Sequence, residues 1–395
     1  MIAFGTSDTG LEAILADPSN DAPRLVWADR EGGERGELVV VQCALAGRTL
    51  SREERRRLKA RETELVSWAS EDGLGAGLSG TFVRGFVERV SVDLGNLDEV
   101  WARAPLCSFL SLRGTSADVS ASGPRPEEAW AGVAERLAKA FAVLPASRVL
   151  GMSSSAEVIE QNINESVVDD RSHFGFGDDF VRLVASAAPL RSVTELCVYE
   201  GALSARAITS LARLPRLRRL RGDFQLSGAN AVALLRAVPS LRQFGPWSRG
   251  LRGAELRTLL AAPEVARLTE LDLCCNSLEE EDLVQLGTCT RLAGLERLAI
   301  GFAAKSQTIE PLTRAPHFGR LEELNLFGFR GSLNASALTQ SSFGSGLRVL
   351  EAHGARVDGG DVSALLSMPS LERVRVSVGP QLRAALEAVI PEVEV

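Results

Sequence analysis

Histidine and aromatic residues are scarce in this chain of 395 residues. Aromatic side chains make up 5% of it, with a single tyrosine, and the three histidines, His173, His317 and His353, lie far apart in the sequence. Zinc sites and Ser-His-Asp triads need imidazoles held close to their partners, yet no histidine here has a second one three or four residues away. The sequence therefore predicts no catalytic residues, no metal site and no cofactor.

Paired cysteines and long apolar runs are also missing. The six cysteines form no Cys-x-x-Cys pair, which argues against a disulfide or zinc framework. The N-terminus, MIAFGTSDTG, lacks the basic start and apolar stretch of a secretory signal. Nowhere do about 18 apolar residues run together, as a membrane-spanning helix requires. We therefore expect reduced thiols, a cytoplasmic location and no contact with a membrane.

The charge balance is mildly acidic, with a formal net charge of −7. A surface that binds nucleic acid must neutralise phosphates, so an acidic chain argues against a nucleic-acid partner.

The strongest positive pattern is an apolar frame, Leu-x-x-Leu-x-Leu with occasional Val or Phe, that recurs every 24 to 27 residues. It opens at Val193, Leu217, Leu241, Leu268, Leu295, Leu321, Leu347 and Leu371. A frame with this period resembles the leucine-rich repeat. Helical stretches such as ANAVALLRAVP follow the frame, and a proline ends several of them just before the next frame, at Pro215, Pro239, Pro263 and Pro369.

Each unit is thus predicted to be one strand followed by one helix. The resemblance to the ribonuclease-inhibitor type of repeat implies an α/β solenoid shaped as a horseshoe, with parallel strands on the concave face and helices on the convex face. It also places Asn276, within LDLCCNSL, where an asparagine hydrogen-bonds to the backbone between turns.

Less regular frames open at Val87, Cys107 and Ser147. We interpret residues 81–192 as degenerate leading repeats, interrupted by insertions near 117–145 and 153–180. Regular repeats are expected over 193–395, where the final stretch QLRAALEAVIPEVEV forms a C-terminal cap.

Residues 1–80 do not follow the repeat and are predicted to form a helical head. Helices are expected over 9–17, 22–30, 37–45 and 51–70, the last with a capping box from Ser51 to Glu54. The segments LEAILADPSNDAPRLVWAD and RGELVVVQCALAG, within residues 11–45, resemble the repeat-companion domain found ahead of leucine-rich repeats in bacterial proteins. The chain departs from that pattern between Asp29 and Arg35.

The concave face is the candidate binding surface. If the frame leucines point inward, the second, fourth and sixth residues after each opening leucine point to this face. Aromatic residues there have no core to fill, and mixed charges suit a folded protein partner. The predicted contact residues are Tyr199, Arg219, Arg221, Trp247, Glu270, Asp272, Phe327, His353, Arg373 and Arg375. The alternative is that the aromatic residues only pack against neighbouring strands or loops.

Two further segments have functional and structural interpretations. The acidic stretch 153–179, with Asp169, Asp170 and Arg171, is either a recognition or cleavage loop or a plain surface loop, and it lacks the spacing of a calcium site. The GxGxxG pattern from Gly75 to Gly80 follows a helix and precedes a strand, the reverse of a dinucleotide site, so we interpret it as a linker.

These patterns together predict a non-enzymatic scaffold, adaptor or sensor subunit that binds a protein partner and no small-molecule substrate. The alternative is a regulator or proteolytic target of a partner enzyme, acting through residues 153–179. A bacterial defence or toxin-control system would fit either prediction.

Overall fold

The computed structural model describes residues 9–17, 20–47, 50–71, 78–100, 104, 106–113, 134–135, 137–139, 141–142, 144, 151–154, 177–198, 203–247, 250–303 and 308–394. The chain divides into two structural units, Met1–Leu196 and Cys197–Val395.

The first unit begins with four helices, which confirms the predicted helical head. They are α1 (Thr9–Ala16), α2 (Asp21–Glu31), α3 (Gly33–Ala46) and α4 (Arg52–Glu71). The predicted capping box is present, because Glu54 N–H donates to Ser51 Oγ at 3.3 Å and Ser51 N–H donates to Glu54 Oε2 at 3.0 Å. Ile14, Trp27 and Val39, one from each of the first three helices, lie in a single buried cluster.

An antiparallel hairpin follows the head, a feature that the parallel-strand prediction did not include. It consists of β1 (Leu78–Val83) and β2 (Phe86–Asp93). The turn residues Arg84 and Gly85 have φ values of 50° and 82°, as a two-residue turn of the mirror-image type requires. Gly80, from the GxGxxG pattern, lies in β1, whereas Gly75 and Gly77 are outside the described residues.

Parallel strands continue from β2 in chain order through β3 (Phe109–Arg113) and β4 (Gly151–Ser154). Val90 pairs with Leu110, which in turn pairs with Met152, so the strands predicted at the three irregular frames are confirmed. The unit also contains η1 (Leu94–Glu99), α8 (Gly177–Ser186) and η2 (Ala188–Ser192). The acidic stretch predicted over 153–179 therefore starts within β4 and ends within α8, and its middle, 155–176, lies outside the described residues.

The second unit repeats strand and helix along its length, while β5 (Glu195–Cys197) spans the boundary between the units. Its strands are β6 (Arg219–Gly222), β7 (Gln243–Pro246), β8 (Glu270–Leu278), β9 (Arg297–Phe302), β10 (Glu323–Phe327), β11 (Val349–Arg356), β12 (Arg373–Ser377) and β13 (Glu392–Glu394). Its helices are α9 (Ala205–Leu211), α10 (Gly228–Ala237), α11 (Ala254–Ala261), α12 (Glu280–Thr288), α13 (Glu310–Thr313), α14 (Ala335–Gln340), α15 (Gly359–Ser367) and α16 (Pro380–Glu387), with short helices η3 (Pro263–Arg267) and η4 (Thr290–Gly294).

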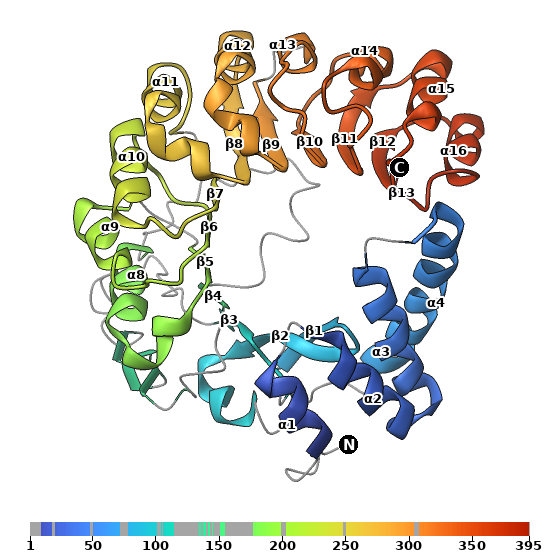
Figure 1. Ribbon diagram of the computed structural model, residues 1–395. Helices are drawn as coiled ribbons and strands as arrows, with labels where there is room; N and C mark the ends of the chain where they lie inside the picture. The colour runs from blue at the N-terminus through green and yellow to red at the C-terminus, as the bar shows by residue number, and fades with distance from the viewer. Residues whose placement is uncertain are drawn as a thin grey trace, which may run out of the picture. The chain divides into compact units, whose positions relative to one another are not determined.

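The strands of the second unit lie in chain order along the inner side of an arc, and the helices lie along its outer side (Figure 1). Neighbouring strands are parallel, for example β9 with β10 and β11 with β12. The leucines that open the frames are buried and fill the space between the two layers. The predicted α/β solenoid of the leucine-rich-repeat type is confirmed, with strands on the concave side of this unit.

Asn276 joins two neighbouring repeats, as the resemblance implied. Its side chain is fully buried, and its Nδ2 donates to the Pro246 carbonyl at 2.8 Å. Its Oδ1 accepts the Leu251 N–H at 2.9 Å. A backbone donor and a backbone acceptor of the preceding turn are thereby satisfied away from water.

Carboxylates near the helix starts form a second connection between repeats. Glu255 accepts the Gly228 N–H at 2.5 Å, Asp282 accepts the Gly253 N–H at 2.7 Å, and Asp361 accepts the Ala335 N–H at 2.8 Å. In each case the carboxylate belongs to one helix and the N–H to the start of the helix before it. These N–H groups have no partner inside their own helix, so the next repeat supplies one. We call these three residues the helix-start carboxylates.

Within the part of the chain that the structure describes, no helix is both long and apolar enough to cross a membrane.

Candidate protein-interaction surface

The surface of interest is formed by side chains on the concave side of strands β6 to β12. We call it the strand face and define it by the second, fourth and sixth residues after each opening leucine of the second unit. In β8, buried frame residues alternate with half-buried face residues such as Glu270 and Asp272. The same alternation in β10 and β12 places Phe327, Arg373 and Arg375 on this face.

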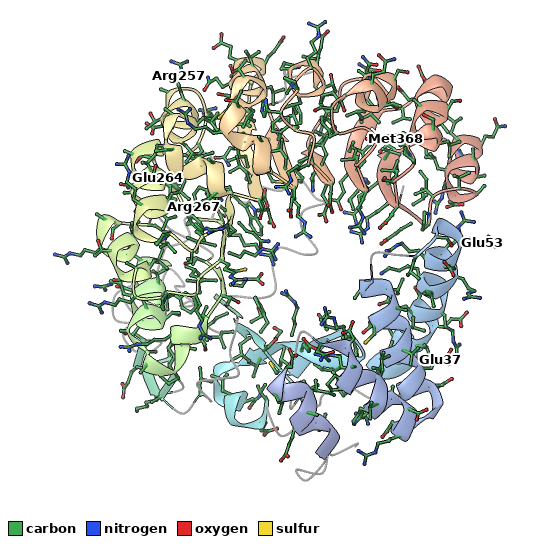
Figure 2. All side chains as sticks on the ribbon, in the orientation of Figure 1. Glu37, Glu53, Arg257, Glu264, Arg267 and Met368 are labelled. Carbon is green, nitrogen blue, oxygen red and sulfur yellow. The ribbon has the colours of Figure 1, made fainter. Side chains whose placement is uncertain are left out.

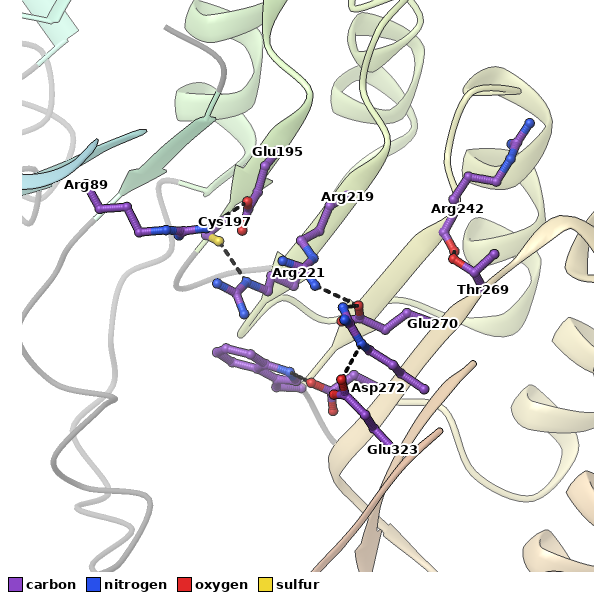
Figure 3. A network of polar contacts seen from close by, with 12 residues as sticks. Arg89, Glu195, Cys197, Arg219, Arg221, Arg242, Thr269, Glu270, Asp272 and Glu323 are labelled. Carbon is purple, nitrogen blue, oxygen red and sulfur yellow. Dashed lines mark hydrogen bonds and ion pairs between the residues drawn. The ribbon is translucent and has the colours of Figure 1, made fainter. Parts of the chain in front are cut away.

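The second residues after the opening leucines form the first row of the strand face. Charged residues in this row pair with each other. Arg219 Nη2 lies 2.7 Å from Glu270 Oε2, and Arg297 Nη1 approaches the same carboxylate oxygen at 3.6 Å. Arg297 Nε also lies 3.0 Å from Glu323 Oε1, which extends the network from β6 to β10 (Figure 3). Burial lowers the pKa of Arg297, but the two carboxylates outweigh it and leave that pKa raised. The row is therefore largely neutralised within the protein.

Trp247 and Asp272 form a polar contact one strand apart. The Trp247 Nε1–H donates to Asp272 Oδ2 at 2.6 Å, and the indole is half-buried. The other carboxylate oxygen, Oδ1, accepts the Cys274 N–H at 3.0 Å. Burial raises the pKa of Asp272, while these two hydrogen bonds oppose the rise. The carboxylate thus fixes the orientation of the tryptophan ring on the strand face.

Small residues lie beside the aromatic ones. Phe327 is half-buried and pairs in register with Gly301 of β9, so no side chain stands between that position and the phenyl ring on this side. Gly245 separates Arg221 from Asp272, and a Cβ there would come within 3.2 Å of both side chains. A glycine thus lies in register beside Phe327, and Gly245 leaves room for the side chains of Arg221 and Asp272.

The C-terminal part of the strand face is also internally paired. Asn325 Nδ2 donates to Glu351 Oε2 at 2.7 Å, and Arg373 Nε lies 2.9 Å from Glu392 Oε2. Burial lowers the pKa of Arg373, and the Glu392 carboxylate outweighs it so that the pKa is raised. His353 is exposed, and its carbonyl accepts a hydrogen bond from the Ser377 hydroxyl.

Cys274 lies on the strand face, and the buried Cys197 of β5 contacts one of its residues. Arg221 Nε donates to Cys197 Sγ at 3.2 Å. Burial, with the neighbouring Asp272 carboxylate, raises the pKa of the half-buried Cys274 thiol well above its usual value. A thiol held in its neutral form is a poor nucleophile, so this geometry does not suit nucleophilic catalysis.

The structure places nine of the ten predicted contact residues, all on the strand face: Arg219, Arg221, Trp247, Glu270, Asp272, Phe327, His353, Arg373 and Arg375. Tyr199 lies outside the described residues, as do Asp169, Asp170 and Arg171 of the acidic stretch. Among the described residues, no group of three or more His, Cys, Asp or Glu side chains is arranged to hold a metal ion.

Sequence reasoning missed the partners Asn325 and Glu392. Asn325 occupies a fourth position of its frame, so the same alternation that selected Asp272 could have found it. Glu392 lies in β13, after the last full frame, and only the pairing of β12 with β13 brings it to Arg373.

No protein-family model matches the chain, and no curated protein matches it. Among solved structures, an internalin of Listeria monocytogenes is 13% identical, covers 90% of this chain and 93% of its own, and has a TM-score of 0.38. Human 5T4 is 18% identical over 51% of this chain and 78% of its own, with a TM-score of 0.34.

A third structure, the Drosophila Toll–Spatzle complex, is 11% identical over 78% of this chain and 36% of that chain, with a TM-score of 0.36. All three scores are below 0.5, so the assignment to a leucine-rich-repeat type of fold rests on the chain's own repeats, strand register and buried leucines.

Proposed function

We propose that this protein binds a folded protein partner on the strand face of its second unit and acts without catalysis, as a scaffold, adaptor or sensor subunit. The observation that carries the proposal is the Trp247 indole, which is partly exposed on the strand face and oriented by its hydrogen bond to Asp272. A pre-oriented aromatic ring loses little conformational entropy on binding, which favours its use as an interface anchor.

The paired charges support the same function. Because Glu270 is already compensated by Arg219 and Arg297, a partner need not neutralise that carboxylate to cover it. The first row then supplies a rigid and nearly neutral part of the surface. The aromatic residues at the sixth position after the opening leucines supply affinity. This division of roles suits an interface with an aromatic centre and a polar surround.

Finer proposals follow from the sequence patterns. We propose a ribonuclease-inhibitor type of repeat, a bacterial and cytoplasmic protein, and a repeat-companion domain over residues 1–80 that offers a second docking surface. Degenerate repeats over 81–192 and regular repeats over 193–395 would complete the domain organisation. The alternative function, regulation or cleavage through residues 153–179, depends on a stretch whose middle lies outside the described residues, so the strand face carries the proposal.

The test is affinity capture from native lysate with the intact chain and with a Tyr199→Ala/Trp247→Ala/Phe327→Ala variant. A protein captured by the intact chain and lost by the variant is the expected result. Trp247→Ala alone should then weaken that partner's affinity by about 2 kcal/mol or more.

Val284→Ala is the matched control, since Val284 is an apolar residue that is 46% exposed on helix α12 rather than on the strands. Capture of the same protein by the triple variant at undiminished affinity would rule out the strand face. Loss of capture only when residues 155–176 are deleted would support the regulatory alternative instead.

A further inference from the structure

Positive charge is concentrated in one part of the second unit. Residues 203–267 contain twelve arginines, no lysine and three acidic residues, which gives this segment a net charge of +9 in a chain whose net charge is −7. In the described part of this segment, Arg219 forms an ion pair with Glu270 at 2.7 Å and Arg236 forms one with Glu264 at 3.0 Å. The remaining positive charge requires a separate explanation.

The residues directly after the opening leucines form a further row, and this row shows where positive charge exceeds negative charge. In the later repeats this row is self-compensating, because Arg348 lies 3.4 Å from Glu322 and 2.8 Å from Glu372. In the earlier repeats the same row places Arg218 beside Arg242, and the Arg242 N–H donates to the Arg218 carbonyl at 2.8 Å. Like charges in register on neighbouring strands repel each other, so this pair costs stability in the isolated protein.

Arg242 and Arg267 are held in place by backbone carbonyls. Arg242 Nη1 donates to the carbonyls of Pro239 and Leu241 at 2.8 and 2.9 Å. Arg267 donates through Nη2 to the Leu235 and Val238 carbonyls, near the end of helix α10. Arg267 Nε also donates to the Leu241 carbonyl at 3.4 Å, so this guanidinium lies against the residue that directly precedes Arg242.

These residues define a second surface, the arginine edge: Arg216, Arg218, Arg242 and Arg267. The first three are exposed, and Arg267 is half-buried. No ion pair to a carboxylate within the described residues is formed by any of the four, and the neighbouring Glu264 is bonded to Arg236. Figure 3 shows the Arg242 side chain extending away from the group formed by Arg219, Glu270 and Asp272, so the arginine edge is distinct from the strand face.

We propose that the arginine edge binds a short acidic segment of a protein partner, rich in Asp and Glu. Guanidinium groups form paired hydrogen bonds with carboxylates, and a bound anion would remove the repulsion between Arg218 and Arg242. Further along the same row stand Glu296 and then Glu322 and Glu372, which Arg348 already compensates, so a polyanion longer than the arginine edge would meet a carboxylate and a neutralised group. A nucleic-acid strand is therefore a poorer fit than a short acidic peptide.

The test measures binding of two fluorescent probes of equal charge, an oligoglutamate peptide and an oligothymidylate, to the intact protein at low and physiological salt. The key variant is Arg216→Glu/Arg218→Glu/Arg242→Glu. The matched control, Arg206→Glu/Arg252→Glu/Arg257→Glu, makes the same charge change at exposed arginines of α9 and around the start of α11. Figure 2 shows Arg257 on the outer side of α11, apart from Arg267.

We expect the peptide to bind more tightly than the oligothymidylate, with a loss of roughly tenfold or more in the key variant and a loss of about threefold or less in the control. Thermal unfolding of both variants checks that they are folded. If the triple charge reversal does not fold, Arg218→Gln/Arg242→Gln replaces it as the key variant. Equal losses in the two variants, absence of peptide binding to the intact protein, or tighter binding of the oligothymidylate would each overturn the proposal. Trp247→Ala should leave peptide binding unchanged, which separates this test from that of the strand face.

Discussion

The backbone N–H of Gly85 donates to the side-chain oxygen of Gln42 at 2.5 Å. Gln42 belongs to helix α3 and is buried, and its Nε2 donates to Glu62 of helix α4 at 2.8 Å. One side chain therefore connects the turn of the β1–β2 hairpin to two helices of the head. At the same turn, a Cβ on Gly85 would lie 2.3 Å from Val39 Cγ2.

Gly85→Ala should destabilise the first unit by about 2 kcal/mol or more, because φ at this residue is 82° and the added methyl group would overlap Val39. Denaturant unfolding measures the change. Gly379→Ala is the control, since a Cβ there meets nothing within 4 Å and its φ of −69° suits alanine. A loss at Gly85 no larger than at Gly379 would contradict the close approach of turn and helix.

Asn276→Ala should cost about 2 kcal/mol, since it leaves the Leu251 N–H and the Pro246 carbonyl buried without their partner. The midpoint of denaturant unfolding reports the loss. Asn230→Ala, in the first turn of helix α10 where the asparagine is half-exposed, should change the midpoint far less. Similar midpoints for the two variants would mean that Asn276 does not join the repeats energetically.

Glu270→Gln should destabilise the second unit more than Glu323→Gln. Glu270 contacts two arginines and its side chain is 15% exposed, whereas Glu323 contacts one and is 37% exposed. We expect about 1–2 kcal/mol for the first change and less than about 1 kcal/mol for the second. Unfolding measured at low and high salt distinguishes them, and a larger loss at Glu323 would refute this ranking.

The Asp272 carboxyl should make stability depend on pH. Its pKa is raised in the folded protein, chiefly by burial, so the folded state binds this proton more tightly than the unfolded state. The contribution to stability is present at acid pH and is lost as the pH rises from about 4 through the folded pKa. Asp272→Asn keeps an acceptor oxygen for one of the two donors, the Trp247 Nε1–H or the Cys274 N–H, at a cost that does not vary with pH, and it has no proton to lose.

The stability of Asp272→Asn relative to the natural protein should therefore increase as the pH rises from about 4 to 7. Thermal unfolding across that range provides the measurement. A relative stability that stays constant or falls over the range would show that burial does not raise this pKa.

The repeat register could be predicted from the sequence because it depends on a local rule. Frame leucines must face the core every 24 to 27 residues, and alternation then fixes which side chains reach the strand face. The role of Asn276 was expected from the resemblance to the ribonuclease-inhibitor type of repeat, which implies an asparagine at that place. The head helices were predictable from local signals such as the Ser51 cap.

The pairing of the face residues could not be predicted. Arg219 bonds Glu270 across the intervening strand β7, where Gln243 stands between them, and such a contact depends on rotamers and on the curvature of the sheet. The hairpin was missed for another reason. Val-Arg-Gly-Phe offers a two-residue turn, but the expectation of parallel strands took precedence over it.

The helix-start carboxylates make the stabilisation between neighbouring repeats run in one direction, from each helix to the helix before it. Asp361 of α15 serves the first turn of α14, so removing α15 deprives α14 of a hydrogen-bond acceptor, while removing α14 leaves the α15 cap intact. Glu255 and Asp282 impose the same order on α10, α11 and α12. Unravelling that starts at the C-terminal end therefore weakens each repeat it reaches next, whereas damage from the other end does not propagate through these bonds. Each of these C-terminal neighbours therefore stabilises the repeat before it, and truncations from the two ends should not have equal effects on stability.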